Sequence, residues 1–139
     1  MSVSDLKDYL ASTSMTFSYK AVMVLALLDS VDQHGKASQS ALIARFHAFY
    51  LERQRRGLPT EKERDRNPSP LLTPNEVSDA QIWQILARYP LPLMDEFITV
   101  DDDSVRIKPA IWAQMSAADL VKLREIAQQR IEAYYEGVE

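Results

Sequence analysis

The segment Phe17–Gln33 constrains the fold of this chain more than any other. Its apolar residues are not confined to one stripe, as they are in a helix that lies on a protein surface. They surround the helix axis on nearly all sides: Ala21, Val22, Val24, Leu25, Ala26, Leu27, Leu28 and Val31. We therefore predict a buried helix in the middle of the fold, with Ser18 as its N-cap. Gly35 suits the left-handed position that follows many helix ends.

Amphipathic patterns predict further helices before and after this segment. Apolar side chains recur at helical spacing in each of them. Two of the segments begin with a polar pair of the capping type, Ser78 with Gln81 and Ser116 with Asp119. The expected helices are Ser2–Leu10, Ser38–Arg56, Ser78–Tyr89 and about Ser116–Tyr135.

A β-hairpin is expected before the last helix. Apolar and polar residues alternate in Phe97–Val100 and in Val105–Ile107, and the turn between them is Asp101-Asp102-Asp103-Ser104. Helix, helix, helix, hairpin, helix is the element order of a winged helix with flanking helices. With 139 residues, 46% of them hydrophobic, the chain is expected to form one domain over residues 1–139. We predict a mainly α fold: a winged-helix-like helical domain with one small β-hairpin and a long C-terminal helix.

Residues 60–74 are predicted to form a mobile charged loop. This segment contains Pro68, Pro70 and Pro74, dense charge and few apolar residues. It therefore offers little burial to offset the entropy lost on ordering.

The composition also bounds the compartment. The chain has no cysteine, which excludes disulfides and thiolate metal sites. Its longest apolar run, Ala21–Leu28, is far shorter than the roughly 20 residues that span a bilayer. The first residues lack the basic start and apolar stretch of a secretory signal. We predict a cytoplasmic protein without a membrane partner.

Charge is unevenly distributed along the chain. Residues 45–66 carry seven Lys or Arg and four Asp or Glu, a local charge of +3, although the whole chain carries −4. The remainder therefore carries −7, of which −5 follows Met94 (five basic and ten acidic residues). A basic strip attracts polyanions whatever the total charge is. Interleaved acids (Glu52, Glu61, Glu63 and Asp65) leave a second interpretation open, a solvated helix end and loop of mixed charge.

No pattern of catalytic or metal-binding residues emerges. The only histidines are His34 and His47, and zinc needs three or four ligands. Asp101–Asp103 lacks the spacing of a calcium-binding loop and is typical of a solvated turn. None of the three glycines opens a phosphate-binding pattern. We predict a non-enzymatic protein with no metal and no cofactor.

Short motifs between Phe17 and Lys62 resemble a known kind of domain. They are Phe17-Ser18-Tyr19-Lys20, then Asp32-Gln33-His34-Gly35, then Phe46 to Arg53 with Gly57-Leu58 following. This part of the chain resembles small accessory domains of bacterial restriction and phage-defence proteins, which accompany DEAD/DEAH helicases or endonucleases. The resemblance implies DNA handling or docking, with the chemistry carried by a larger helicase or nuclease partner.

Two functions of different classes follow. The first is a nucleic-acid-binding accessory module of a bacterial defence or DNA-processing system, which holds DNA weakly or without sequence preference. Its expected contact residues are Lys20, Tyr50, Arg53, Arg55, Arg56, Lys62, Arg64 and Arg66. The second is a protein-interaction module that docks a larger enzyme or forms a homo-oligomer, with Tyr134 and Tyr135 of the C-terminal helix at the interface. An enzyme with an unrecognised site is a third hypothesis.

Overall fold

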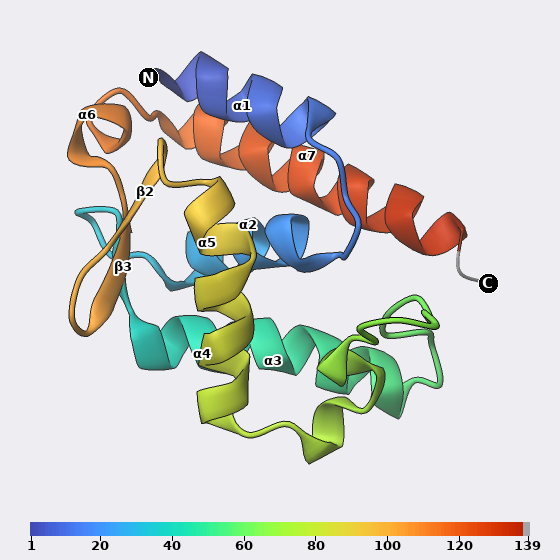
Figure 1. Ribbon diagram of the computed structural model, residues 1–139. Coiled ribbons are helices and arrows are strands. Elements are labelled where there is room, and N and C mark those ends of the chain that lie inside the picture. Colours follow the sequence, from blue (N-terminus) through green and yellow to red (C-terminus); the bar gives the residue numbers. More distant parts are fainter. Residues whose placement is uncertain (138–139) are drawn as a thin grey trace.

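A helix in the middle of the molecule organises the fold. A computed structural model describes residues 1–137 (Figure 1). Helix α2 (Tyr19–Ser30) lies between α7 (Ala117–Glu136) and α3 (Gln39–Arg55), and it packs against both. Eight of its residues are buried, among them Ala21 and Met23 with no exposed surface. The predicted central helix is therefore confirmed, two to three residues shorter at each end.

The remaining helices cover this core from two sides. Helix α1 (Val3–Ser12) packs along α7, and α4 (Asp79–Arg88) packs against α3 and the short α5 (Pro90–Leu93). Both predicted capping boxes are present. The Ser78 and Ser116 hydroxyls accept the backbone N–H groups of Gln81 and Asp119, whose side chains accept the serine N–H groups in return.

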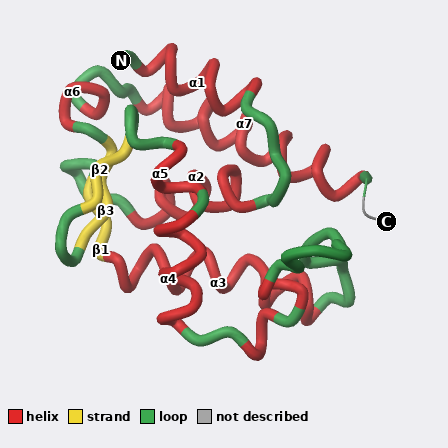
Figure 2. The backbone as a smooth tube through the Cα atoms, in the orientation of Figure 1, coloured by secondary structure: helices red, strands yellow, loops and turns green. Residues whose placement is uncertain are grey.

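A small antiparallel sheet closes one side of the molecule (Figure 2). The predicted hairpin is confirmed as β2 (Ile98–Val100) and β3 (Ser104–Ile107). The structure adds a third strand, β1 (Lys36–Ser38), which pairs with β3 and gives the order β1-β3-β2. Three residues are too few to show an alternating pattern, so the sequence offered no signal for β1. A short helix, α6 (Pro109–Trp112), follows β3.

Gly35 joins the central helix to the sheet. Its φ of 74° lies in the left-handed region, as predicted. A Cβ atom at this position would lie 2.6 Å from the Trp112 ring, so no larger residue fits there. The same Trp112 donates its indole N–H to the Gln33 carbonyl at 2.9 Å. The turn after α2 and the helix after β3 are thereby locked together.

The fold is mainly helical, with a three-stranded antiparallel sheet and a long C-terminal helix. Its hydrophobic cluster draws on residues from Val3 to Tyr135. In the described part of the chain, no helix is long and apolar enough to cross a membrane.

Residues 60–74 are packed at both ends. Thr60 and Glu61 are buried at the start of the segment, and Ser69 and Leu71 are buried further on. The segment contains two short 3-10 helices, η1 (Pro70–Leu72) and η2 (Pro74–Glu76). Between the packed ends, residues 63–68 are exposed. The mobility of this exposed part stays a prediction.

Candidate nucleic-acid interface

Four of the predicted basic residues lie over aromatic rings. In each pair the cation and the ring come from different parts of the chain, so the contact exists only in the folded protein. The pairs, with the distance from the charged atom to the ring centroid, are Arg53 over Tyr135 (3.5 Å), Lys62 over Tyr134 (4.5 Å), Arg64 over Phe17 (4.9 Å) and Lys20 over Tyr9 (5.6 Å). A cation within about 6 Å of a ring centroid is attracted by the electron-rich ring face.

Three of the pairs are connected to one another. Tyr134 and Tyr135 contact each other edge to face, with their centroids 5.2 Å apart. The Tyr134 hydroxyl lies 3.5 Å from the carbonyl of Thr16, the residue before Phe17. The pairs of Arg53, Lys62 and Arg64 therefore lie near one another, between the end of α3 and the start of α2. We call these four pairs, together with the exposed Arg56 and Arg66, the cation–aromatic surface.

The other predicted cations differ in how far they are neutralised. Arg55 forms an ion pair with Glu52, in which its Nε lies 2.8 Å from a carboxylate oxygen. An exposed pair of this kind adds little stability but cancels the local charge. Arg56 and Arg66 are exposed, and neither forms a salt bridge within residues 1–137. These two cations are the ones most open to an incoming anion.

Tyr50 lies beneath this surface rather than on it. Its side chain has no exposed area, so it cannot contact a nucleobase. The prediction that Tyr50 is a contact residue is therefore wrong. Its hydroxyl lies 2.7 Å from the Ser18 Oγ, and Tyr135 donates its own hydroxyl to the Thr60 carbonyl at 2.7 Å. Burial raises the pKa of both phenols, that of Tyr135 to about 12. Tyr50 therefore supports the surface from below.

A buried carboxylate holds the start of the 60–74 segment against α2. Glu61 is 2% exposed, and one of its oxygens accepts the Ser18 hydroxyl at 2.8 Å and the Ser18 N–H at 3.3 Å. Its other oxygen accepts the Lys62 N–H at 3.2 Å. Burial raises the pKa of this carboxyl, and the hydrogen bonds from Ser18 and Lys62 offset part of that rise.

Ser18 holds the N-cap position of α2, as predicted, but without a capping side-chain hydrogen bond. Ser18 has helical backbone angles and its hydroxyl caps no N–H of α2. A capping side chain accepts from the first turn, and it normally belongs to a residue with extended backbone. Here the Glu61 carboxylate, 43 positions along the chain, lies at the helix start, where negative charge is favoured by the helix dipole.

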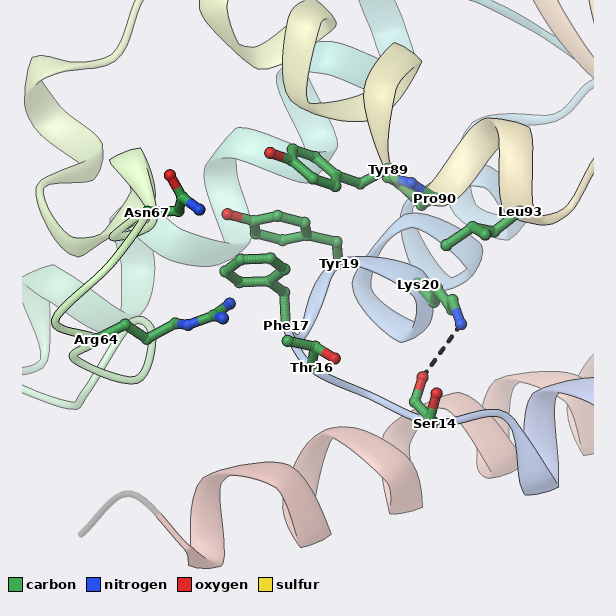
Figure 3. Close-up of a pocket in the computed structure, with 10 residues that line it drawn as sticks. All are labelled: Ser14, Thr16, Phe17, Tyr19, Lys20, Arg64, Asn67, Tyr89, Pro90 and Leu93. Atoms are coloured by element: carbon green, nitrogen blue, oxygen red, sulfur yellow. Dashed lines mark hydrogen bonds between the residues drawn. The ribbon is translucent and has the colours of Figure 1, made fainter.

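A cleft of about 460 Å³ lies at the end of the cation–aromatic surface (Figure 3). Three rings form its aromatic wall. Phe17 and Tyr19 are stacked, with centroids 4.7 Å apart and planes inclined by 8°, and Tyr89 lies 5.9 Å from Tyr19. Lys20 and Arg64, both predicted contact residues, line the same cleft.

A second cavity of about 250 Å³ adjoins the first. The two share Phe17, Tyr19, Asn67 and Tyr89. The second is completed by polar side chains of α4, which are Gln81, Gln84 and Arg88. Among residues 1–137, the side chains that line the two cavities include three cations, Lys20, Arg64 and Arg88, and no carboxylate. In a chain with a net charge of −4, this region is selectively positive.

Sequence reasoning missed Tyr89 and Asn67. Tyr89 follows the last residue of α4 and directly precedes Pro90, and an aromatic residue at such a helix end is a weak signal of exposure. Asn67 has a φ of 50° and precedes Pro68. Asparagine tolerates the left-handed region better than most residues, but a following proline disfavours it. Nothing in the local sequence predicts that either residue faces Phe17.

The acidic hairpin lies at the other side of the molecule. Asp101, Asp102 and Asp103 are exposed, and the Gln39 side chain donates to the carbonyls of Asp101 and Asp102 at 3.0 and 3.1 Å. Within residues 1–137 no cluster of three or more His, Cys, Asp or Glu side chains is placed to hold a metal ion.

The oligomer interface expected on α7 cannot use its tyrosines. Tyr134 and Tyr135 are 6% and 4% exposed, and they pack inside the fold. The residues that α7 exposes are mostly polar, with Val121 as its one large exposed apolar side chain among residues 117–136. Homo-oligomerisation through this helix stays a prediction, without these two residues.

Comparison of the chain with protein-family models, with curated proteins and with solved structures finds no match in any of the three. The resemblance of Phe17–Lys62 to accessory domains of defence systems therefore stays a prediction as well.

Proposed function

We propose that this chain is a non-enzymatic nucleic-acid-binding module that holds unpaired strands through the cation–aromatic surface. The observation that carries the proposal is the pair of adjoining cavities at its end. Three cations and three aromatic rings line them, and no carboxylate of residues 1–137 does. Arginine and lysine attract phosphates, and aromatic rings stack on bases whose faces are open.

The mixture of rings and cations favours a single strand over a duplex. In a duplex each base is covered by its neighbours, so exposed rings gain nothing from it. In a single strand the bases turn outward and stack on side chains without regard to sequence. Arginine and lysine on a loop contact phosphates, which position a strand but do not read it. Weak sequence preference follows.

The arrangement of elements supports a winged-helix fold for this module. Apart from the short η1, η2 and α5, the elements follow the order α2-β1-α3-α4-β2-β3. This order, with β3 in the centre of the sheet, agrees with such a fold. In it, α4 takes the place of the recognition helix, and the β2–β3 hairpin takes that of the wing. The side of α4 that carries Gln84 and Arg88 lines the second cavity, whereas the wing carries three aspartates. Strand binding is therefore proposed for α4 and the 60–74 segment, not for the wing.

The biological setting is proposed from the resemblance of Phe17–Lys62. A module of this kind would bring a strand to a larger helicase or nuclease in a bacterial defence or DNA-processing system. The chemistry would belong to that partner.

A groove favours docking to a partner protein as the second candidate function. It has a volume of about 250 Å³ between α2 and α3, and it is lined by Leu25 and Phe49 with Asp29 and Arg45 at its edges. Leu25 and Phe49 are half-buried, in contrast to the fully buried position expected for Leu25. An apolar groove with charges of both signs fits a protein surface better than a polyanion.

A salt titration tests the main proposal. The chain should bind single-stranded DNA more tightly than duplex DNA of equal length, and the affinity should fall with salt at a log–log slope of about −0.7 per bound phosphate. The triple variant Arg56→Ala, Arg64→Ala, Arg66→Ala should flatten this slope by about 0.7 for each phosphate that it no longer binds.

The matched control removes three exposed cations elsewhere: Lys36→Ala, Arg45→Ala, Lys122→Ala. It changes the net charge equally, so it should leave the slope near that of the wild type. Equal weakening in both triple variants would place the binding site elsewhere. Absence of binding to single- or double-stranded DNA and to RNA at low salt would refute the proposal and leave protein docking as the leading function.

A further inference from the structure

Tyr89, in the wall of the cleft, is the most accessible aromatic residue among residues 1–137. It is 43% exposed, and all other aromatic residues in this range are buried or half-buried. Its ring is inclined by 52° to Tyr19 and by 58° to Phe17, so neither neighbour stacks on it. Because Tyr89 is 43% exposed and neither neighbour stacks on it, part of its ring surface is free to contact a ligand.

Phe17 differs from Tyr89 in this respect. One face is covered by Tyr19, stacked at 4.7 Å, and the Arg64 guanidinium lies over the ring at 4.9 Å. Because Tyr19 and Arg64 already cover the Phe17 ring, this ring positions Arg64 at the cleft and does not serve as a stacking surface for a ligand. A planar ligand that enters the cleft finds Tyr89 as its stacking surface.

Unused hydrogen-bond donors surround this open ring. The Asn67 amide and the guanidinium groups of Arg64 and Arg88 line the two cavities, and none of them forms a hydrogen bond within residues 1–137. Figure 3 shows the Asn67 amide beside Tyr19 and Tyr89, with Arg64 on the far side of Phe17. Lys20 donates to the Thr13 hydroxyl at 2.7 Å and to the Ser14 carbonyl at 3.1 Å, which leaves one of its three protons.

We infer that the cleft holds one unpaired nucleotide of a strand, with its base stacked on Tyr89 and the flanking phosphates near Arg64 and Lys20, which line the same cleft. This inference rests on the proposed function and specifies where a base enters. The volume of about 460 Å³ falls in the range of roughly 300–1,000 Å³ that small-ligand sites occupy. Asn67 has the donor and the acceptor that the edge of a base requires.

The charge of the lining selects this ligand over other planar or apolar ones. A cationic ligand would need a carboxylate or an uncharged cage, but the rings here are accompanied by cations. A proline-rich peptide also docks on aromatic rings. It gains nothing from Arg64, Lys20 and Arg88, so the observations favour the nucleotide.

A double-mutant cycle between protein and strand tests the inference. The probe is a short oligothymidylate, compared with a strand of the same length in which every base is replaced by an abasic spacer. Removal of a stacked base should weaken binding to the wild type by about five- to 150-fold, since base–aromatic stacking contributes roughly 1–3 kcal/mol. Tyr89→Leu should weaken oligothymidylate binding by a similar factor and bind both strands almost equally.

The variants are chosen to keep the fold. Leucine preserves the apolar bulk that Tyr89 presents to Phe17 and Tyr19 but lacks an aromatic face. Tyr89→Trp should restore the difference between the two strands, and thermal melts should show the same midpoint for all three proteins. Thymidine monophosphate serves as a competitor: displacement of the strand by the free nucleotide at comparable concentration would assign the cleft to mononucleotides.

The outcomes separate this inference from the proposed function. Equal binding of both strands by the wild type would overturn the nucleotide site and leave phosphate binding intact. Persistence of the difference in Tyr89→Leu would also overturn it, because the base would then stack elsewhere. If neither strand binds but a proline-rich peptide does, both the inference and the proposed function are wrong.

Discussion

Two charged segments extend from the helical core, the Asp101–Asp103 turn and the 60–74 segment, and different kinds of contact hold them in place. At the sheet end, the Asp101–Asp103 turn is fixed by backbone pairing of β2 with β3 and by the side chain of Gln39. At the loop end, the buried residues Thr60, Glu61 and Ser69 are held by side chains from distant segments. These side chains are Tyr135, Ser18 and Tyr19. Figures 1 and 2 show the two ends on opposite sides of the molecule.

The charges of the two ends differ in their surroundings as well. The aspartates of the sheet end are exposed to water. At the loop end, cations lie over rings and the Glu61 carboxylate is buried at the start of α2. Backbone pairing tolerates changes of exposed side chains, but a network of buried side chains does not. The loop end should therefore respond to single substitutions far more strongly than the sheet end.

The largest expected effect is that of Tyr50→Ala. Tyr50 is fully buried under the loop end, where it contacts the rings of Phe46 and Phe49. Removing a buried aromatic ring leaves a cavity and should lower the free energy of unfolding by about 3–5 kcal/mol. Val100→Ala, at a sheet-end position that is 44% exposed, should change it by no more than about 0.5 kcal/mol. Denaturant unfolding of both variants measures the contrast, and similar losses of stability would show that the two ends do not differ.

A smaller effect is expected for Glu61, and it depends on pH. Burial raises the pKa of this carboxyl above 4.5, so the folded protein holds the proton more tightly than the unfolded chain. Stability from this group is therefore greatest at low pH, and it is lost as the pH rises from about 4.5 through the raised pKa. Above both values the loss is complete and constant.

The measurement is the difference in unfolding free energy between the wild type and Glu61→Gln at several pH values. The wild type should lose stability relative to the glutamine variant as the pH rises, while contributions from other groups cancel. Glu63→Gln removes an exposed carboxylate two positions on and controls for the change in net charge. A difference that does not vary with pH would mean that the Glu61 carboxyl is well hydrated in the folded protein.

The contrast between the ends also explains which features could be predicted from the sequence. The hairpin, both capping boxes and the central helix depend on residues a few positions apart, and all of them were predicted. The burial of Thr60, Glu61 and Tyr50 depends on contacts between segments more than thirty positions apart in the sequence. A polar segment such as 60–74 has no hydrophobic periodicity from which its packing could be predicted.

The candidate site divides in the same way. Arg64 was predicted from the basic strip and Lys20 as its neighbour, and the fold brings both to one cleft. Tyr50 was named for its proximity in sequence, but an α-helix turns successive residues to different sides, and its ring faces the core. Tyr89 is exposed at a helix end, because α4 stops at Arg88 before Pro90. The local sequence can indicate this helix end, but only the tertiary structure places it next to Phe17.

The smallest expected effect concerns the sheet end. Asp101→Asn, Asp102→Asn and Asp103→Asn together remove three negative charges, and their influence on a strand at the loop end is a long-range one. At physiological ionic strength such interactions are screened beyond about 8 Å. We expect the affinity for single-stranded DNA to rise by less than about twofold at that salt concentration, and somewhat more at low salt.

The matched control for this triple variant is Glu125→Gln, Glu132→Gln and Glu136→Gln, which removes three exposed carboxylates from α7. Equal small changes in the two variants would mean that both act through the general field of the protein. A large gain confined to the aspartate variant would show that the hairpin approaches the strand. In that case the wing, and not the loop end alone, would form part of the interface, and the contrast between the two ends would apply to folding but not to binding.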